Sequence, residues 1–352
     1  MTTTRRRLLT GTAGLAVAMP TIARGAGTKR WRCVTSWARN MPGPGVSARR
    51  LAERITLLSQ RELVIDVFAA GEIVPALQTF DAVSAGTVEM AHTAAVFWSG
   101  KMPAAPLFCT APFGLSPTAH MAWLDSGAQA QWDALYAPHR VKPFIAGNTG
   151  PSAAGWFRRE IKTLADMKGL RIRATGIGGE VYAALGATPL AIPPADTYAA
   201  LERGVIDAVE LLAPANDLPS GFNRIAPFYG FPGFNKPNGA SELLIAEAAW
   251  NSLSTDLQRV VEVACRTEHD VALAECETAN AAAMAQLSTA GTTAFWLGDD
   301  VLAVARTATQ ASLERIAKTG TGARSIVDSY MAFRESSSMW RRLSDTARAR
   351  LG

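Results

Sequence analysis

The chain has 352 residues, more than one hydrophobic core usually supports, so two domains are expected. With 48% hydrophobic and 18% charged residues, 29 glycines and 19 prolines, the composition excludes a disordered chain, a collagen-like chain and a long coiled coil. The net charge of +5 would suit a nucleic-acid partner, but residues 1–26 hold four arginines and no acidic residue. The rest of the chain is therefore nearly neutral, at about +1, and no nucleic-acid partner is expected.

An export signal is predicted at residues 1–26. A basic segment at 5–7 precedes an apolar run at 15–20, and small residues follow at 23–26. This is the order of an export signal, and paired arginines before two leucines resemble a twin-arginine signal, which implies export in a folded state. The apolar run is shorter than the ~20 residues that span a bilayer. The signal is therefore predicted to be cleaved, leaving a soluble, periplasmic protein.

The residue types that metal centres and catalytic sites need are scattered along the chain. None of the common nucleophile, phosphate-loop or zinc-protease motifs is present, and the glycine-rich segment 176–179 lacks the third spaced glycine of a dinucleotide site. The cysteines form no CxxC pair and are expected to be buried thiols, and the histidines lack zinc spacing. The residues concerned are Cys33, Cys109, Cys265, Cys276, His92, His120, His139 and His269.

Strand and helix patterns alternate from about residue 30 to 210, which predicts a mostly parallel α/β architecture. Segment 255–288 contains neither glycine nor proline and is rich in Ala, Glu, Val and Leu, so a helix of about nine turns is expected, long enough to cross two domains. The predicted strands are 31–36, 63–67, 140–146, 152–158, 170–174, 188–192, 206–210 and 292–297. The other predicted helices are 45–59, 75–86, 179–186, 194–203, 299–319 and 324–349.

Segments 80–92 and 198–210 match in residue type and in length. Each ends a helix, reaches a glycine (Gly86 or Gly204) and starts a strand with a β-branched and an acidic residue. One interpretation is that any helix–glycine–strand unit has this pattern. The other is two similar lobes whose strands end at a shared cleft, where α/β sheets bind ligands. The second interpretation places these residues across the cleft from one another: His92 and Thr93, and Glu210 and Leu211.

Two charged residues at predicted strand ends are candidates for a binding site. Arg171 and Arg173 share one face of strand 170–174, and a guanidinium just before a glycine loop can bind a carboxylate through two parallel hydrogen bonds. Glu210 precedes an apolar segment and would need a cation or donors there. The alternatives are a surface arginine on an edge strand and a solvated glutamate. Aromatic and amide candidates, which core packing would also explain, are Phe97, Trp98, Asn148, Trp156, Phe157, Asn216 and Phe234.

Many short segments, in one order over about 30–290, resemble the solute-binding proteins of tripartite ATP-independent periplasmic (TRAP) transporters. The resemblance implies a periplasmic-binding-protein-like α/β fold, with two lobes around a central cleft and a long helix spanning both. It also implies a protein that is not an enzyme and that carries an organic acid to a membrane permease. Segments that carry it are FAAGEIVP at 68–75, EMAHTAA at 89–95, WSGKMPAA at 98–105, GNTG at 147–150, GWFR at 155–158, LADMKGLRIR at 164–173, LGATP at 185–189 and GVIDA at 204–208.

The resemblance also implies how the chain divides and which residues bind. Lobe I is predicted at 27–150 with part of 232–290, and lobe II at 151–231 with part of 291–352. The family's carboxylate-binding arginine falls on Arg173. The most similar subgroup binds 2-oxo or 2-hydroxy monocarboxylates with a bridging cation, whose glutamate falls on Glu210. The other ligand-binding positions implied are Phe97, Trp98, Asn148, Ser152, Trp156, Leu211, Asn216, Phe234 and Asn235.

Several residues depart from the subgroup's pattern. Ser152 stands where the subgroup has a glutamine that reaches the cation, and Leu211 stands where it has an aromatic residue. A Na⁺ or Ca²⁺ ion would therefore have only Glu210, Ser152 and the Leu211 carbonyl as ligands, which argues against it; no other cofactor is expected. Val96 and Phe97 replace two tyrosines, and Phe234-Asn235, followed by Lys236, replaces a Trp-His pair. The pocket is thus more apolar than the subgroup's, which favours an acid with an apolar portion.

The sequence leaves two further hypotheses about the function open. One is a binding protein of the same fold that serves a sensor or a different permease. The other is a periplasmic hydrolase or isomerase with Glu210 and His92 as acid and base. The expected partners are a small carboxylate ligand and the subunits of a TRAP permease. A homodimer, the identity of the acid and the position of signal cleavage stay undetermined.

Overall fold

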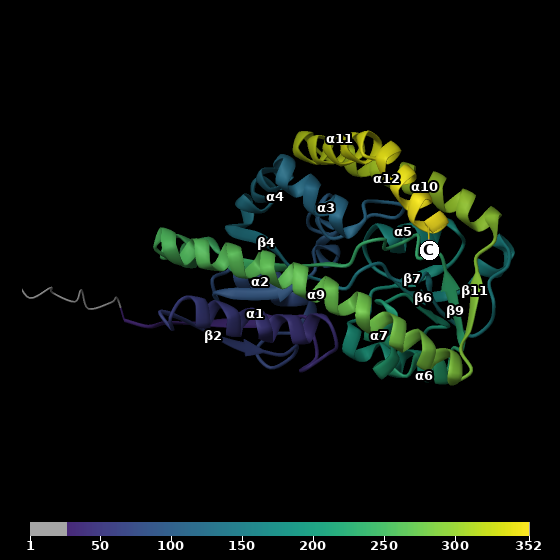
Figure 1. Cartoon of the computed structure of the whole chain (residues 1–352), viewed down its shortest axis with the longest axis horizontal. Coiled ribbons are helices and arrows are strands. Elements are labelled where there is room, and N and C mark those ends of the chain that lie inside the picture. The colour runs from purple at the N-terminus through teal and green to yellow at the C-terminus, as the bar shows by residue number, and fades with distance from the viewer. Residues whose placement is uncertain (1–26, 352) are drawn as a thin grey trace, which may run out of the picture.

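The computed structural model describes residues 27–351, so the predicted export signal at 1–26 lies outside the described residues. Two β-sheets lie one after the other along the long axis of the molecule, each covered by helices (Figure 1). The first has strand order β2-β1-β3-β10-β4, with β1 Lys29–Thr35, β2 Leu63–Phe68, β3 Met90–Thr93, β4 Val141–Asn148 and β10 Ala240–Ala246. The second has order β11-β9-β5-β8-β6-β7, with β5 Gly155–Phe157, β6 Arg171–Arg173, β7 Thr188–Leu190, β8 Ala208–Val209, β9 Phe228–Phe231 and β11 Thr293–Trp296.

Helices flank both sheets, and buried apolar side chains fill the space between helices and strands on each lobe. The predicted fold class, two α/β lobes with a spanning helix, is confirmed. The helices are α1 Pro44–Leu58, α2 Thr79–Ser84, α3 Pro117–Trp123, α4 Gln129–Tyr136, α5 Gly176–Ala184, α6 Thr197–Glu202, α7 Pro214–Asp217, α8 Glu247–Asn251, α9 Thr255–Thr289, α10 Asp299–Ala317, α11 Thr321–Ser336 and α12 Ser338–Leu351.

The sheets are mixed, whereas the alternating pattern predicted mostly parallel ones. Strands β1, β2 and β3 pair in parallel, as do β6, β7 and β8 and the pair β9–β11. Every antiparallel pair involves β5 or β10. These are the strands that follow the two loop crossings between the lobes, β4 to β5 and β9 to β10. The chain also crosses through α9, and the strand that follows, β11, pairs in parallel with β9. The reversed strands thus accompany the loop crossings.

The matching segments at 80–92 and 198–210 form the same unit in the two lobes. Gly86 ends α2 before β3, and Gly204 ends α6 before β8; their φ angles are 70° and 69°. A side chain is strained at such positive φ values, which is why glycine stands at both positions. The interpretation as two similar lobes therefore holds for this unit.

The spanning helix α9 has 35 residues, about 52 Å at 1.5 Å per residue. It packs on α1 and β4 in the first lobe and on α7 in the second, and Figure 1 shows it (green) running past both sheets. Its N-cap Ser254 accepts a hydrogen bond from the Leu257 amide, which starts the helix. The prediction of a long helix across both lobes is confirmed.

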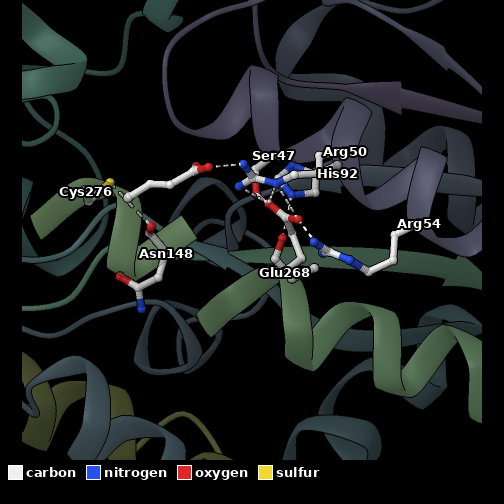
Figure 2. Close-up of polar contacts among 9 residues, drawn as sticks. Ser47, Arg50, Arg54, His92, Asn148, Glu268 and Cys276 are labelled. Carbon is white, nitrogen blue, oxygen red and sulfur yellow. Dashed lines mark hydrogen bonds and ion pairs between the residues drawn. The ribbon is translucent and has the colours of Figure 1, made fainter. Parts of the chain in front are cut away.

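A buried cluster fastens α9 to α1. The Glu268 carboxylate, fully buried on α9, accepts hydrogen bonds from Ser47 Oγ at 2.5 Å and from the guanidinium groups of Arg50 and Arg54 at 2.7 and 2.6 Å. Figure 2 shows the three donors converging on Glu268. Arg50 also forms an ion pair, at 2.5 Å, with Glu275, which lies about two helical turns after Glu268 on α9. We call Ser47, Arg50, Arg54 and Glu268 the α1–α9 clamp.

The C-terminal helix predicted at 324–349 is two helices, α11 and α12, which break at Ser337. The Ser337 hydroxyl donates to the Phe333 carbonyl at 2.7 Å, and it stands in a run of three serines. Serine side chains compete for backbone hydrogen bonds and so weaken a helix interior. In the described part of the chain, no helix is both long and apolar enough to span a membrane.

All four cysteines are free and buried, as the sequence predicts. Burial raises the pKa of the Cys33 and Cys109 thiols to about 12, which keeps them protonated and unreactive near neutral pH.

Candidate functional site

A narrow cavity lies between the two sheets, where strands of both lobes end. Its first-lobe wall follows β1, β3 and β4, and its second-lobe wall follows β6, β7 and β8. Its volume of about 30 Å³ has room for roughly two water molecules. The lining residues are Trp37, Pro44, Ala94, Val96, Phe97, Cys109, Thr149, Arg173, Thr175, Pro194, Leu211, Leu212, Lys236, Gly239, Ala240 and Ser241.

Arg173 is the buried cation of this cavity. Its strand β6 lies between β7 and β8, and the residue is only 2% exposed, which excludes a surface arginine on an edge strand. Nε donates to the Ile192 carbonyl at 3.1 Å and Nη1 to the Glu210 carbonyl at 2.8 Å. Among the described residues no acceptor binds Nη2, so this nitrogen is free for a ligand. Burial lowers the pKa of the guanidinium, and the nearby Glu210 and Asp217 oppose that shift.

Glu210 is buried as well, which excludes a solvated strand end. Its Oε1 lies 2.6 Å from Lys236 Nζ, and its Oε2 lies 3.7 Å from Arg173 Nη1. The same Lys236 ammonium donates to the Leu211 carbonyl oxygen at 2.6 Å. One carboxylate between two cations leaves this group with a net charge of about +1, since Lys and Arg are protonated near neutral pH.

The predicted cation ligands do not converge on an open position. Glu210 Oε1 and the Leu211 carbonyl both contact Lys236 Nζ. Ser152 Oγ donates to the Lys236 carbonyl at 3.3 Å, and the Ser152 amide donates to that same oxygen at 3.0 Å. Within residues 27–351 no group of three or more His, Cys, Asp or Glu side chains is arranged to hold a metal ion.

Two chain segments that cross between the lobes, 149–154 and 230–239, run side by side, and Thr149, Lys236 and Gly239 from them line the cavity. The Thr149 amide donates to the Gly239 carbonyl at 3.0 Å, and the Ala154 amide to the Gly230 carbonyl at 2.8 Å. The contact is so close that a Cβ atom at Gly233 would lie 1.6 Å from the Ser152 carbonyl oxygen. The backbone hydrogen bonds between the two crossing segments thus fix the positions of Lys236 and Ser152 relative to each other.

Three predicted site residues support the walls instead of lining the cavity. Trp98 donates from Nε1 to Glu242 at 2.6 Å inside the first-lobe core. Trp156 donates from Nε1 to the buried Asp217 at 2.9 Å; burial raises the pKa of that carboxyl to about 7. Asn148 donates to Asn238 Oδ1 at 2.7 Å, and its carbonyl accepts from Cys276 of α9, a contact drawn in Figure 2.

The remaining predicted residues lie in the second lobe near the crossings. Phe234 stacks on Phe113 with ring centroids 5.4 Å apart and belongs to the core. Asn216 is buried on α7, with its amide nitrogen directed at Gly43 of the first lobe. Within the described residues, Asn216 Oδ1 and both polar side-chain atoms of Asn235 have no hydrogen-bond partner. Such buried groups usually bond to water or a ligand.

His92 does not face the cavity, contrary to the interpretation of the matching segments. It is fully buried, with Nε2 donating to the Ala146 carbonyl at 2.9 Å and Nδ1 accepting from Trp37 Nε1 at 2.8 Å. Both ring nitrogens are therefore occupied, and an acid–base pair of Glu210 and His92 is not assembled. The first-lobe wall comes instead from Ala94, Val96 and Phe97.

Sequence reasoning singled out Arg173, Phe97 and Leu211, which line the cavity, and missed several other lining residues. Trp37, Thr149 and Thr175 follow the ends of β1, β4 and β6 by one or two residues. The rule that ligands bind beyond the carboxyl ends of strands could have identified them, had it been applied to every predicted strand.

A larger cavity of about 1000 Å³ lies between α1 and the edge strand β2. Its charged lining residues are all exposed or half-buried, and two of them, Arg49 and Glu53, form an ion pair one helical turn apart; the others are Arg39, Arg61 and Asp66. We place the site in the smaller cavity because it holds the buried charges of Arg173 and Lys236, which Glu210 only partly neutralises. Burying such charge is costly, and perturbed charged groups in a cleft are typical of functional sites.

Burial raises the pKa of Glu242 to about 8, and this gives a testable pH dependence. The carboxyl lies in the core, bonded to Trp98 Nε1 and to the Tyr136 hydroxyl. Because the folded protein holds this proton up to a higher pH than the unfolded chain, stability should fall as pH rises between about 4.5 and 8. The Glu242→Gln variant should lack this fall, which amounts to at most about 1.4 kcal/mol per pH unit.

The measurement is urea unfolding of both proteins at pH 5, 6, 7, 8 and 9. Contributions from other titrating groups cancel in the difference between the two proteins. Parallel pH profiles would contradict a protonated, buried Glu242.

The chain is similar to known extracellular solute-binding proteins. The family model of the bacterial extracellular solute-binding proteins, family 7, matches residues 36–319. A monocarboxylate 2-oxoacid-binding periplasmic protein of Nostoc sp. is 34% identical over 317 residues, 90% of this chain and 87% of the relative.

Two solved structures are similar over nearly their whole length. A TRAP transporter solute-binding protein of Bordetella bronchiseptica has a TM-score of 0.90 and 33% identity, covering 93% of this chain and 97% of the relative. It is a mixed-occupancy dimer, with calcium and picolinate in one site and an apo site in the other. A TRAP solute-binding protein of Pseudoalteromonas atlantica, with sodium and pyruvate bound, has a TM-score of 0.88 and 32% identity, covering 91% and 98%.

The predicted resemblance is therefore confirmed, and so are the predicted function as a binding protein rather than an enzyme and its location outside the cytoplasm. The chain belongs to family 7 of the bacterial extracellular solute-binding proteins, as a solute-binding protein of the TRAP transporter type.

Proposed function

We propose that the protein binds a small 2-oxo or 2-hydroxy monocarboxylate in the cavity between its lobes and delivers it to a TRAP permease. The observation that carries this proposal is Arg173, buried at the cavity with Nη2 free of acceptors among the described residues. A guanidinium so placed binds a carboxylate by charge-assisted hydrogen bonds, which are strong in a site that excludes water.

The charge and the apolar lining of the cavity support this class of ligand. The group of Arg173, Glu210 and Lys236 carries about +1, which one carboxylate neutralises. Most of the other lining residues are apolar, so a second carboxylate would be buried without a partner. A second hollow of about 350 Å³ shares Val96, Phe97 and Thr175 with the cavity, and it could accept an apolar substituent of the acid.

Capture and release would use the connections between the lobes. The two crossing segments and α9 join the lobes, and rotation about them would open the cleft for the acid and close it around the bound ligand. The closed protein would then present both lobes to the permease. A homodimer, as in the Bordetella relative, stays an expectation that light scattering would decide.

The relatives' calcium and sodium raise the question of a cation here. The residues present do not fit one. Two of the three predicted ligand oxygens are engaged by Lys236 Nζ, and the third, Ser152 Oγ, donates to the Lys236 backbone. We therefore assign no cation to the proposed site.

A thermal-shift screen tests the proposed ligand class. Pyruvate, lactate, picolinate and longer 2-oxo monocarboxylates are expected to raise the melting temperature by several degrees, because a ligand at 100 times its Kd adds about 2.7 kcal/mol of stability. Succinate, malate and glucuronate are expected to shift it little. Stabilisation by dicarboxylates, sugars or amino acids, with no effect of any monocarboxylate, would refute the proposal.

A further inference from the structure

Two residues that depart from the subgroup's pattern, Ser152 and Leu211, both contact Lys236, which directly follows the substituted pair Phe234-Asn235. Lys236 lies on the crossing from β9 to β10, Ser152 on the crossing from β4 to β5, and Leu211 just after β8. They are up to 84 positions apart in the chain, yet the backbone of Lys236 bonds to Ser152 and its side chain to Leu211. Because Lys236 contacts both departing residues, we treat Ser152, Leu211 and Lys236 as one structural unit.

The Lys236 ammonium occupies the position between two predicted cation ligands. Nζ lies 2.6 Å from Glu210 Oε1 and 2.6 Å from the Leu211 carbonyl oxygen. Calcium binds oxygen at about 2.3–2.6 Å, nearly the same distance. A metal ion using these two oxygens would compete with the ammonium for their lone pairs, and the two positive charges would repel each other in a buried site.

Ser152 positions the backbone of Lys236. Its amide and hydroxyl both donate to the Lys236 carbonyl oxygen, at 3.0 and 3.3 Å. The Lys236 side chain is about 10% exposed, so its charge is desolvated and depends on its ion pair with Glu210 and its hydrogen bond to Leu211. A short hydroxyl at position 152 therefore fixes the lysine backbone, where a longer amide side chain would be needed to reach a metal.

We propose that the Lys236 ammonium replaces the bridging cation, so that this protein binds its acid without sodium or calcium. An ammonium has three N–H donors. The Leu211 carbonyl accepts one of them, Glu210 Oε1 is the ion-pair partner at 2.6 Å, and another N–H donates to an oxygen of the ligand while Arg173 pairs with the ligand carboxylate. A lysine carries the same single charge as sodium, so the site keeps its net charge. This proposal rests on the proposed function and specifies how that site recognises its ligand.

Calorimetry with pyruvate tests the cation requirement directly. Wild-type protein, treated with chelator and exchanged into sodium-free buffer, should bind pyruvate with a Kd within twofold of that measured with 1 mM CaCl₂ or 100 mM NaCl. Lys236→Gln should weaken binding about tenfold, and Lys162→Gln, at an exposed lysine on the second lobe, should leave it unchanged. Binding that appears only with added cation would overturn the proposal and leave the proposed function standing.

A second measurement needs no organic ligand. Terbium luminescence, with Tb³⁺ as a probe for calcium sites, should detect no site in the wild type. The double variant Ser152→Gln/Lys236→Ala frees both oxygens and restores a longer ligand, so it should bind Tb³⁺ and make pyruvate binding calcium-dependent. Equal Tb³⁺ binding by wild type and double variant would overturn the proposal. If no acid bound under any condition, the proposed function would fail, and the luminescence would still decide the role of Lys236.

Discussion

Replacing Arg173 with alanine is expected to weaken binding of pyruvate, or of the tightest acid in the screen, by about thirtyfold to several thousandfold. Truncating one partner of a buried, hydrogen-bonded charge pair costs about 2–5 kcal/mol, and each 1.4 kcal/mol is a factor of ten in Kd. The loss should be near the upper end, because the ligand carboxylate would remain beside Glu210, whose charge only Lys236 would then offset.

Arg171→Ala is the matched control, two residues earlier on the same strand. Arg171 is exposed and forms a bidentate pair with Asp207 at 2.8 and 2.7 Å, away from the cavity. Its removal should leave the Kd unchanged. Arg173→Lys should give an intermediate loss, since it keeps the charge without the planar, two-pronged donor geometry. Calorimetry at one pH and ionic strength measures all three variants, and a Kd for Arg173→Ala within threefold of wild type would contradict the assignment.

Much of the fold follows from local patterns, and what was missed is mostly non-local. The absence of glycine and proline from 255–288 predicts α9 to within a residue or two, and the glycines at 86 and 204 mark helix ends in both lobes. The reversed direction of β5 and β10 could not be predicted, because alternation of side chains is the same in parallel and antiparallel strands. The reversal accompanies the two loop crossings between the lobes, which no local pattern reveals.

The site residues also divide into those that local sequence patterns predict and those that depend on non-local contacts. Arg173 and Leu211 could be found because they stand at strand ends, next to a glycine loop and an apolar segment. Trp98, on the other hand, follows β3 closely but turns toward the buried Glu242, a partner 144 positions away that no local pattern reveals. The contact of Lys236 with Glu210 and Leu211 is equally non-local. The sequence shows that Ser152 and Leu211 differ from the subgroup, but only the structure shows that both contact Lys236.

Removing the Glu268 side chain is expected to cost about 3–5 kcal/mol of folding free energy, a large share of the total stability of an ordinary domain. In Glu268→Ala the α1–α9 clamp loses its only carboxylate within the described residues, leaving Arg50 and Arg54 without that acceptor (Figure 2). Their side chains are about a fifth exposed, so water offsets part of the loss. The cost should therefore lie near the lower end of the range, as measured by urea unfolding followed by circular dichroism.

Glu275→Ala, on the same helix and paired with the same arginine, is the control. Its carboxylate is 57% exposed, and surface pairs contribute about 0–1 kcal/mol, so this variant should unfold almost as the wild type does. The clamp also predicts coupling: Arg54→Ala in the Glu268→Ala background should cost less than in the wild type, by at least about 0.5 kcal/mol. Strictly additive costs would contradict it and would mean that Glu268 stabilises α9 by packing alone. A real coupling would mean that charge holds α1, whose first residue Pro44 lines the cavity, to the helix that spans both lobes.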